Sequence, residues 1–146
     1  GPKGGDEINI IVAGDNYGWP LVSHGFEYGT DDKVSEHDSL PGFNDPEWVW
    51  IPSIAPSGMD FYPIASDLEM MFPDLQGDLL VGSLKFRRLY SISINEDGLP
   101  KRERILLDGN LGRIRDVAVA KDGSILILND ESSFSKPRGG LYRIYK

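Results

Sequence analysis

The repeat that points to an architecture begins with Gly77-Asp78-Leu79-Leu80-Val81-Gly82 and continues with Arg88-Leu89-Tyr90-Ser91-Ile92-Ser93. A similar pair of segments follows it, Gly123-Ser124-Ile125-Leu126-Ile127-Leu128 and then Gly140-Leu141-Tyr142-Arg143-Ile144-Tyr145. The two copies are 46 residues apart at their first glycines. A period of roughly 40–50 residues with several short strands in each unit is the signature of a β-propeller.

The apolar residues of these strands lie on both faces, as they do in a propeller blade that is sandwiched between two neighbours. A β-sandwich, which also has many short strands, is the alternative, and the repeat favours the propeller. We therefore predict an all-β fold, with one or two helical turns over residues 64–72. Strands are expected at residues 7–12, 48–51, 59–62, 77–84, 88–94, 101–107, 114–120, 124–129 and 140–145.

The length of 146 residues suits one domain. We divide it into a blade with a long acidic loop (residues 1–56), a full blade (57–110) and an incomplete last blade (111–146). About three blades do not close a ring, since closed propellers have at least four, and natural proteins avoid open sheet edges. We therefore expect the chain to be the C-terminal part of a larger protein, or to pair with a second copy. The isolated chain is not expected to be a stable monomer.

Composition excludes several classes of function. The chain has 23 acidic and 15 basic residues and a net charge of -8, which argues against nucleic acid or an anionic membrane as a partner. No apolar run approaches the roughly 20 residues of a membrane span. There is no cysteine, so disulfides, thiolate metal sites and cysteine nucleophiles are excluded.

A pair of arginines stands out in this acidic chain. Arg113 and Arg115 alternate with Ile114 on a predicted strand, so the two guanidinium groups share one face. Each guanidinium presents a planar fork of donors that matches a carboxylate or phosphate. The pair indicates either a pocket for a polyanionic ligand or two salt bridges, with Asp116 or with distant acids. The residues alone favour the salt bridges.

Five motifs in a fixed order carry a resemblance to a known family. Together they resemble the soluble quinoprotein glucose/sorbosone dehydrogenases, and within these the bacterial aldose sugar dehydrogenases. The resemblance extends over almost the whole chain, apart from the loop at residues 30–44. The motifs are Gly1-Pro2-Lys3-Gly4-Gly5-Asp6-Glu7-Ile8-Asn9, Asn16-Tyr17-Gly18-Trp19-Pro20, Pro52-Ser53-Ile54-Ala55-Pro56-Ser57-Gly58-Met59, Arg113-Ile114-Arg115-Asp116-Val117 and Asn129-Asp130-Glu131-Ser132.

The resemblance implies a six-bladed β-propeller, of which this chain contributes about three C-terminal blades, with pyrroloquinoline quinone (PQQ) and calcium on its top face. PQQ is planar and bears three carboxylates, which gives the arginine pair a specific partner and reverses the preference for salt bridges. A solvated lysine and a core tyrosine are the alternatives for Lys85 and Tyr28. The cofactor-binding residues that the resemblance implies are Tyr28, Ser83, Leu84, Lys85, Arg113, Ile114 and Arg115.

The resemblance also implies calcium ligands, and calcium prefers hard oxygen donors. Glu7 and the carbonyl of Tyr17 match a structural calcium site of the family. Gly1 and Pro2 match carbonyls that bind the calcium of the cofactor, provided that these two residues are native and do not come from cloning. The alternative for Glu7 is a carboxylate that caps a loop amide.

The activity implied is oxidation of an aldose at its anomeric carbon to a lactone. The proton-abstracting histidine of the family lies upstream of this chain, and neither His24 nor His37 matches it, so no catalytic residue is assigned. The alternatives are a non-catalytic binding propeller and an inactive fragment. The converging cations Lys85, Arg113 and Arg115 favour the enzyme. The resemblance implies a periplasmic or secreted location, while the sugar and the electron acceptor stay unassigned.

Overall fold

A computed structural model of the chain describes residues 2–65, 70–131 and 138–146. The chain divides into two compact units, Gly1–Ile54 and Ala55–Lys146. Within the described residues, helical structure is limited to the 3₁₀ turn η1 (Pro73–Leu75), and no helix is long and apolar enough to cross a membrane. Helical turns are expected from the sequence over residues 64–72, but residues 66–69 lie outside the described part, and residues 64, 65 and 70–72 are not helical.

Within its described residues, the N-terminal unit has one small sheet. Strands β1 (Asp6–Ile8) and β2 (Trp48–Trp50) pair in antiparallel fashion. The expectation that the first strand continues to residue 12 is wrong. The hydroxyl of Tyr17 donates to the carbonyl of Ile10 at 2.8 Å and accepts from the amide of Val12 at 2.7 Å. These backbone groups therefore bond to a side chain instead of to a neighbouring strand.

Irregular chain fills the rest of the N-terminal unit. Isolated bridges pair Phe26 with Lys3 and with Lys33. An ion pair between Lys33 and Asp38, at 3.1 Å, lies within the long acidic loop. The loop is thus tied to the unit by local contacts, although it forms no named strand within the described residues.

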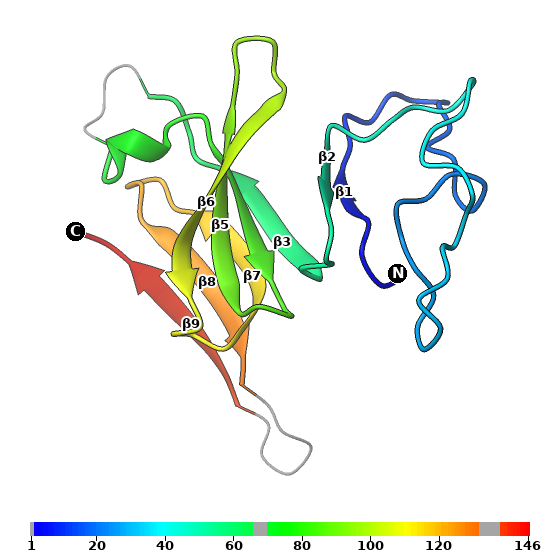
Figure 1. Cartoon of the computed structure of the whole chain (residues 1–146). Helices are drawn as coiled ribbons and strands as arrows, with labels where there is room; N and C mark the ends of the chain where they lie inside the picture. Colours follow the sequence, from blue (N-terminus) through cyan, green and yellow to red (C-terminus); the bar gives the residue numbers. More distant parts are fainter. Residues whose placement is uncertain (1, 66–69, 132–137) are drawn as a thin grey trace. The chain divides into compact units, whose positions relative to one another are not determined.

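The C-terminal unit contains a four-stranded antiparallel sheet of the kind that makes one propeller blade (Figure 1). Its order follows the sequence, from β3 (Pro56–Phe61) through β4 (Leu79–Ser83) and β5 (Arg88–Ile94) to β6 (Pro100–Asp108). All five residues of β4 are buried, as expected for a strand that is apolar on both faces. The four strands predicted between residues 59 and 107 are confirmed to within a few residues at each end.

The second sheet of this unit has three antiparallel strands, β7 (Arg113–Val119), β8 (Ile125–Asp130) and β9 (Gly139–Ile144). Strand β7 packs against β3 and β4, which brings the two sheets together. One apolar core lies between them, and its fully buried members are Tyr62, Leu80, Leu89, Ile114 and Ile127. The three strands predicted for residues 114–145 are confirmed.

A glycine permits a close approach between the two sheets. A Cβ atom on Gly82 of β4 would lie 2.6 Å from Cγ2 of Ile114 on β7. Beside this contact the hydroxyl of Ser57, on β3, donates to the carbonyl of Ile114 at 2.7 Å. The start of β7 is therefore fixed against β3 and β4, and this end of the strand carries the arginine pair.

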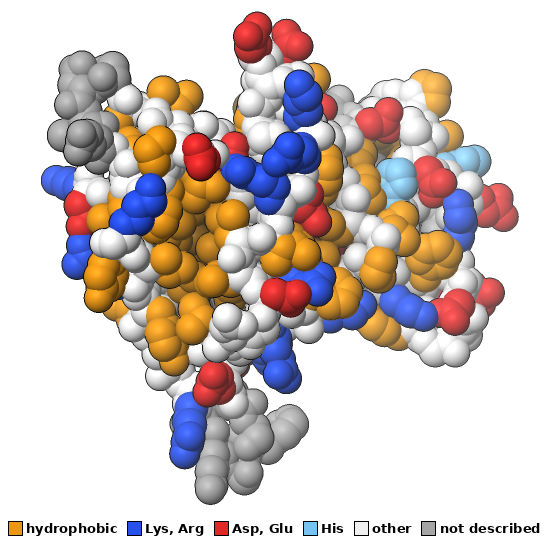
Figure 2. Space-filling view, turned by 60° about the vertical axis from the view of Figure 1, so that its left-hand side comes forward, with side chains coloured by type: hydrophobic (Ala, Val, Ile, Leu, Met, Phe, Trp, Pro, Cys, Tyr) orange, Lys and Arg blue, Asp and Glu red, His pale blue; other side chains and the backbone are white. Residues whose placement is uncertain are grey.

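Apolar side chains also reach the surface (Figure 2). In the C-terminal unit, Leu128 on β8 and Leu141 on β9 are 46% and 70% exposed. They line a shallow hollow together with Val117 and Leu126. One face of this sheet thus packs against the β3–β6 sheet and the other presents apolar side chains, as expected for blade strands that are apolar on both faces.

Candidate functional site

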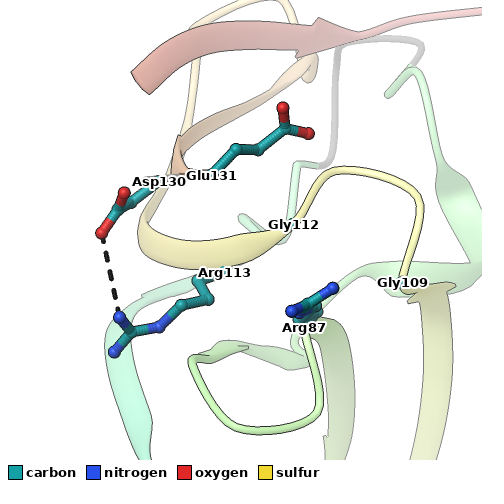
Figure 3. A pocket seen from close by; sticks show the side chains of 6 residues that line it. All are labelled: Arg87, Gly109, Gly112, Arg113, Asp130 and Glu131. Carbon is teal, nitrogen blue, oxygen red and sulfur yellow. Dashed lines mark ion pairs between the residues drawn. The ribbon is translucent and has the colours of Figure 1, made fainter. Parts of the chain in front are cut away.

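A cavity of about 190 Å³ lies where β7 begins (Figure 3). Its walls come from three places: the hairpin between β4 and β5, the loop between β6 and β7, and the end of β8. The amide of Gly109 donates to the carbonyl of Arg87 at 3.0 Å, which joins the hairpin to the loop. The cavity is lined by Arg87, Gly109, Gly112, Arg113, Asp130 and Glu131.

The loop that forms one wall is held in place by glycine and by a buried amide. Gly112 has φ +71°, and a Cβ there would lie 2.7 Å from Cγ of Glu131, so the position requires glycine. The side chain of Asn129 is buried; its amide donates to the carbonyl of Leu111, and its oxygen accepts from the amide of Gly140 at 2.7 Å. Asn129 therefore fixes the loop against β8 and β9.

The two arginines of the predicted pair meet at one carboxylate. Nη2 and Nε of Arg115 donate to the same Oδ2 atom of Asp130, at 2.6 and 3.2 Å. Nη1 of Arg113 lies 4.0 Å from that oxygen, beyond hydrogen-bond distance. Ion pairing of the two arginines is therefore present, but the acceptor is a shared Asp130 instead of two separate acids. Arg113 keeps donors that are available to a ligand in the cavity.

The strand has an irregularity at this point. Arg113 pairs with Asp130 and Ile114 with Asn129, and the register then shifts before Asp116. Arg115 is thus the extra residue of a β-bulge, a device that redirects side chains. Ile114 remains fully buried on the opposite side, as the alternation predicts.

The remaining predicted cofactor ligands of this unit lie near the β4–β5 hairpin. Nζ of Lys85 is 5.3 Å from the centroid of the Phe86 ring, and Lys85 is not among the residues that line the cavity. Ser83 is fully buried, and its hydroxyl accepts from the amide of Phe86 at 3.1 Å. Leu84 bonds through its amide to the carbonyl of Ala55 at 2.9 Å. The structure brings Arg113 and Arg115 together and leaves the role of Lys85 a prediction.

The N-terminal unit contains the predicted calcium ligands and one predicted cofactor ligand. Glu7 lies on β1, where its Oε2 accepts from Nδ2 of Asn9 at 3.2 Å. Tyr17 lies in the irregular chain that follows β1, and no hydrogen bond joins it to Glu7 within the described chain. Tyr28 is 72% exposed, so it is not a core residue. Pro2 is half-buried, and Gly1 lies outside the described residues.

Three charged residues of the cavity were not assigned from the sequence. Asp130 and Glu131 belong to a motif that carried the resemblance, and the position of Asp130 opposite Arg113 follows only once the register is known. Arg87 lies between Phe86 and Arg88 in a hairpin that contains no glycine. Its positive φ of 58° is not signalled by its residue type.

The neighbouring Arg88 differs from Arg87 because its guanidinium forms a bidentate ion pair. Its Nε and Nη2 donate to the two oxygens of Asp108, at 2.7 and 3.1 Å. This bidentate bond holds the pKa of Asp108 below its usual range and raises the pKa of Arg88. Arg88 thus links β5 to β6 and does not line the cavity.

Comparison with known proteins identifies the family and the fold of the chain. The family model for glucose/sorbosone dehydrogenases matches residues 1–142. The aldose sugar dehydrogenase YliI of Escherichia coli is 42% identical over 134 residues, which are 91% of this chain and 34% of that protein. A crystal structure of a glucose dehydrogenase superposes with a TM-score of 0.82 at 34% identity, covering 100% of this chain and 39% of the other.

The fold is shared more widely than the sequence. The PQQ-bound aldose sugar dehydrogenase of Streptomyces coelicolor matches 97% of this chain and 37% of its own, with a TM-score of 0.65 at 23% identity. This chain spans about a third of the length of the curated relatives it matches, 31% and 34%. The nearly all-β structure, with its antiparallel sheets, is that of part of their β-propeller.

Proposed function

The chain belongs to the glucose/sorbosone dehydrogenase family, and we propose that it is part of a quinoprotein that oxidises an aldose at the anomeric carbon to a lactone. The observation that carries the proposal is that only one arginine of the pair is bonded to an acidic residue. Arg115 neutralises Asp130, while Arg113 stays beyond hydrogen-bond distance of it and lines a cavity. A guanidinium with available donors beside a cavity is suited to a carboxylate ligand.

The donor set fits PQQ. Three carboxylates on a planar ring call for fixed cations. Arg113 and Lys85 are the residues that would hold them, while Arg115 is bonded to Asp130 and leaves Arg113 available. When bound, PQQ supplies the two-electron oxidation of the sugar, and the protein contributes binding, orientation and charge. The PQQ-bound structure of the Streptomyces coelicolor relative supports this choice of cofactor.

Calcium would be held in the N-terminal unit by oxygen atoms, including Glu7 and the carbonyl of Tyr17. The described residues contain no group of three or more acidic or histidine side chains suited to a metal, so carbonyl and amide oxygens would be needed. Asn9 offers one: its Oδ1 is buried without a hydrogen-bond partner, while its Nδ2 bonds to Glu7 at 3.2 Å. This unpaired oxygen beside a carboxylate fits a hard cation.

No residue of this chain is assigned the abstraction of the substrate proton. His24 is half-buried and His37 is exposed, and neither lines the cationic cavity. The chain contributes residues that bind and orient the cofactor, and we place the base elsewhere in the full-length protein. A periplasmic or secreted location, as in the family, is part of the same proposal.

An activity assay tests this function. The full-length protein is incubated with PQQ and calcium, and a panel of aldoses is offered with an artificial electron-accepting dye. We expect sugar-dependent reduction of the dye that requires PQQ, and a large loss in Arg113→Gln. Tight PQQ binding without oxidation of any aldose would favour a non-catalytic binding propeller, and the absence of both would contradict the proposal.

A further inference from the structure

We propose that Arg87 is a further anion-binding residue of the cavity and that it takes a carboxylate of the bound ligand. This inference rests on the proposed function only for the identity of that ligand. Arg87 lies outside the cation set Lys85, Arg113 and Arg115. It reaches the cavity from the β4–β5 hairpin, whereas Arg113 and Arg115 lie on β7 (Figure 3).

The first support is the charge balance of the cavity. Asp130 is occupied by Arg115 and approached by Arg113. Figure 3 shows the carboxylate of Glu131 pointing away from the guanidinium groups of Arg87 and Arg113. Within the described part of the chain, the guanidinium of Arg87 has neither an ion pair nor a hydrogen bond, unlike that of neighbouring Arg88. Arg87 is therefore a cation whose counter-charge a ligand would supply.

The second support is the backbone of Arg87. Its φ of 58° is in the left-handed region, where glycine or asparagine is favoured and a long side chain is disfavoured. Strain of this kind is found at ligand-binding sites when the surrounding structure holds it in place. Here the amide of Gly109 donates to the carbonyl of Arg87 at 3.0 Å and holds the hairpin to the cavity loop. An arginine at this position presents a guanidinium to the cavity, which glycine would not.

The third support is the chemistry that the residues share. Arg87 and Arg113 reach the cavity from different connections, and each offers a planar fork of donors. Two forks at one small cavity suit a ligand with at least two carboxylates. Such a ligand is either PQQ or a free polycarboxylic acid, and binding experiments distinguish the two.

The test measures binding of PQQ, and separately of citrate, to the full-length protein by calorimetry. Three variants are compared: Arg87→Asn, which tolerates a positive φ; Arg87→Lys, which restores the charge without the fork; and Arg102→Gln, which removes an equal charge from an exposed position on β6. We expect Arg87→Asn to raise the Kd for the carboxylate ligand roughly tenfold or more, and Arg87→Lys to recover part of it. Arg102→Gln should match wild type.

Thermal melting separates binding from folding. Arg87→Asn removes a strained residue, so its Tm should equal or exceed that of wild type. If PQQ does not bind the wild type but citrate binds and depends on Arg87, the proposed function fails and this inference stands. If PQQ binds and neither ligand responds to Arg87→Asn, this inference is overturned and the proposed function stands. If neither ligand binds the wild type, both are overturned.

Discussion

The guanidinium of Arg115 donates two hydrogen bonds to a single oxygen of Asp130, from Nη2 at 2.6 Å and from Nε at 3.2 Å. This bond crosses from the bulge of β7 to the end of β8. It removes the negative charge that would otherwise compete with an anionic ligand for Arg113. The relationship makes Asp130 a positioning residue for the cationic cavity.

We predict that Arg115 and Asp130 are energetically coupled. Asp130→Asn, Arg115→Gln and the double variant form a cycle, and we expect a coupling of about 1 kcal/mol, because the pair is partly exposed. Urea denaturation measures it. Additive effects of the two substitutions would show that the observed bond does not stabilise the fold.

A second prediction concerns the contact between the two sheets. Gly82→Ala places a Cβ at 2.6 Å from Cγ2 of Ile114 and 2.8 Å from Oγ of Ser57, and Ile114 is fully buried and unable to move aside. We expect a loss of about 1–3 kcal/mol in the free energy of unfolding. An unchanged denaturation midpoint would contradict this close approach of β4 to β7.

A third prediction concerns Tyr62. Its hydroxyl, in a side chain only 1% exposed, donates to the carbonyl of Gly123 at 2.8 Å and accepts from the amide of Phe72 at 3.0 Å. Tyr62→Phe leaves both backbone groups without this partner, and we expect a loss of about 1–3 kcal/mol. The exposed Tyr145 provides the matched control, since Tyr145→Phe should leave stability unchanged. Equal stability of both variants would refute the assigned bonds.

A fourth prediction concerns acid stability. The hydrogen bond from Arg88 lowers the pKa of Asp108 from its ordinary value of 3.8. A carboxyl whose pKa is lower in the folded state stabilises the protein above the unfolded pKa and loses that contribution as the pH falls through the folded pKa. Asp108→Asn should therefore weaken the dependence of stability on pH below about pH 4. The difference should shrink in high salt because the pair is exposed. Melting curves measured from pH 2 to 6 that are parallel for both proteins would contradict it.

The sequence predicts the strands of the C-terminal unit well because their apolar repeat reflects burial on both faces. It also singles out Arg113 and Arg115. It does not reveal Asp130 as their shared partner, because that depends on the register between β7 and β8 and on a bulge. The sequence does not predict that Arg87 lines the cavity, because the backbone there has a positive φ that arginine does not favour. The strand expected to reach Val12 ends at Ile8, because the hydroxyl of Tyr17 takes the backbone bonds beyond it.

The most direct test of the central claim is an experimental structure of the full-length protein with PQQ and calcium. We predict that PQQ lies against the start of β7, with its carboxylates in contact with Arg113 and Arg87, and with Arg115 still bonded to Asp130. PQQ bound away from β7, or density for a complete fold with no PQQ at saturating concentration, would contradict the assignment of this chain to the cofactor site of a quinoprotein dehydrogenase.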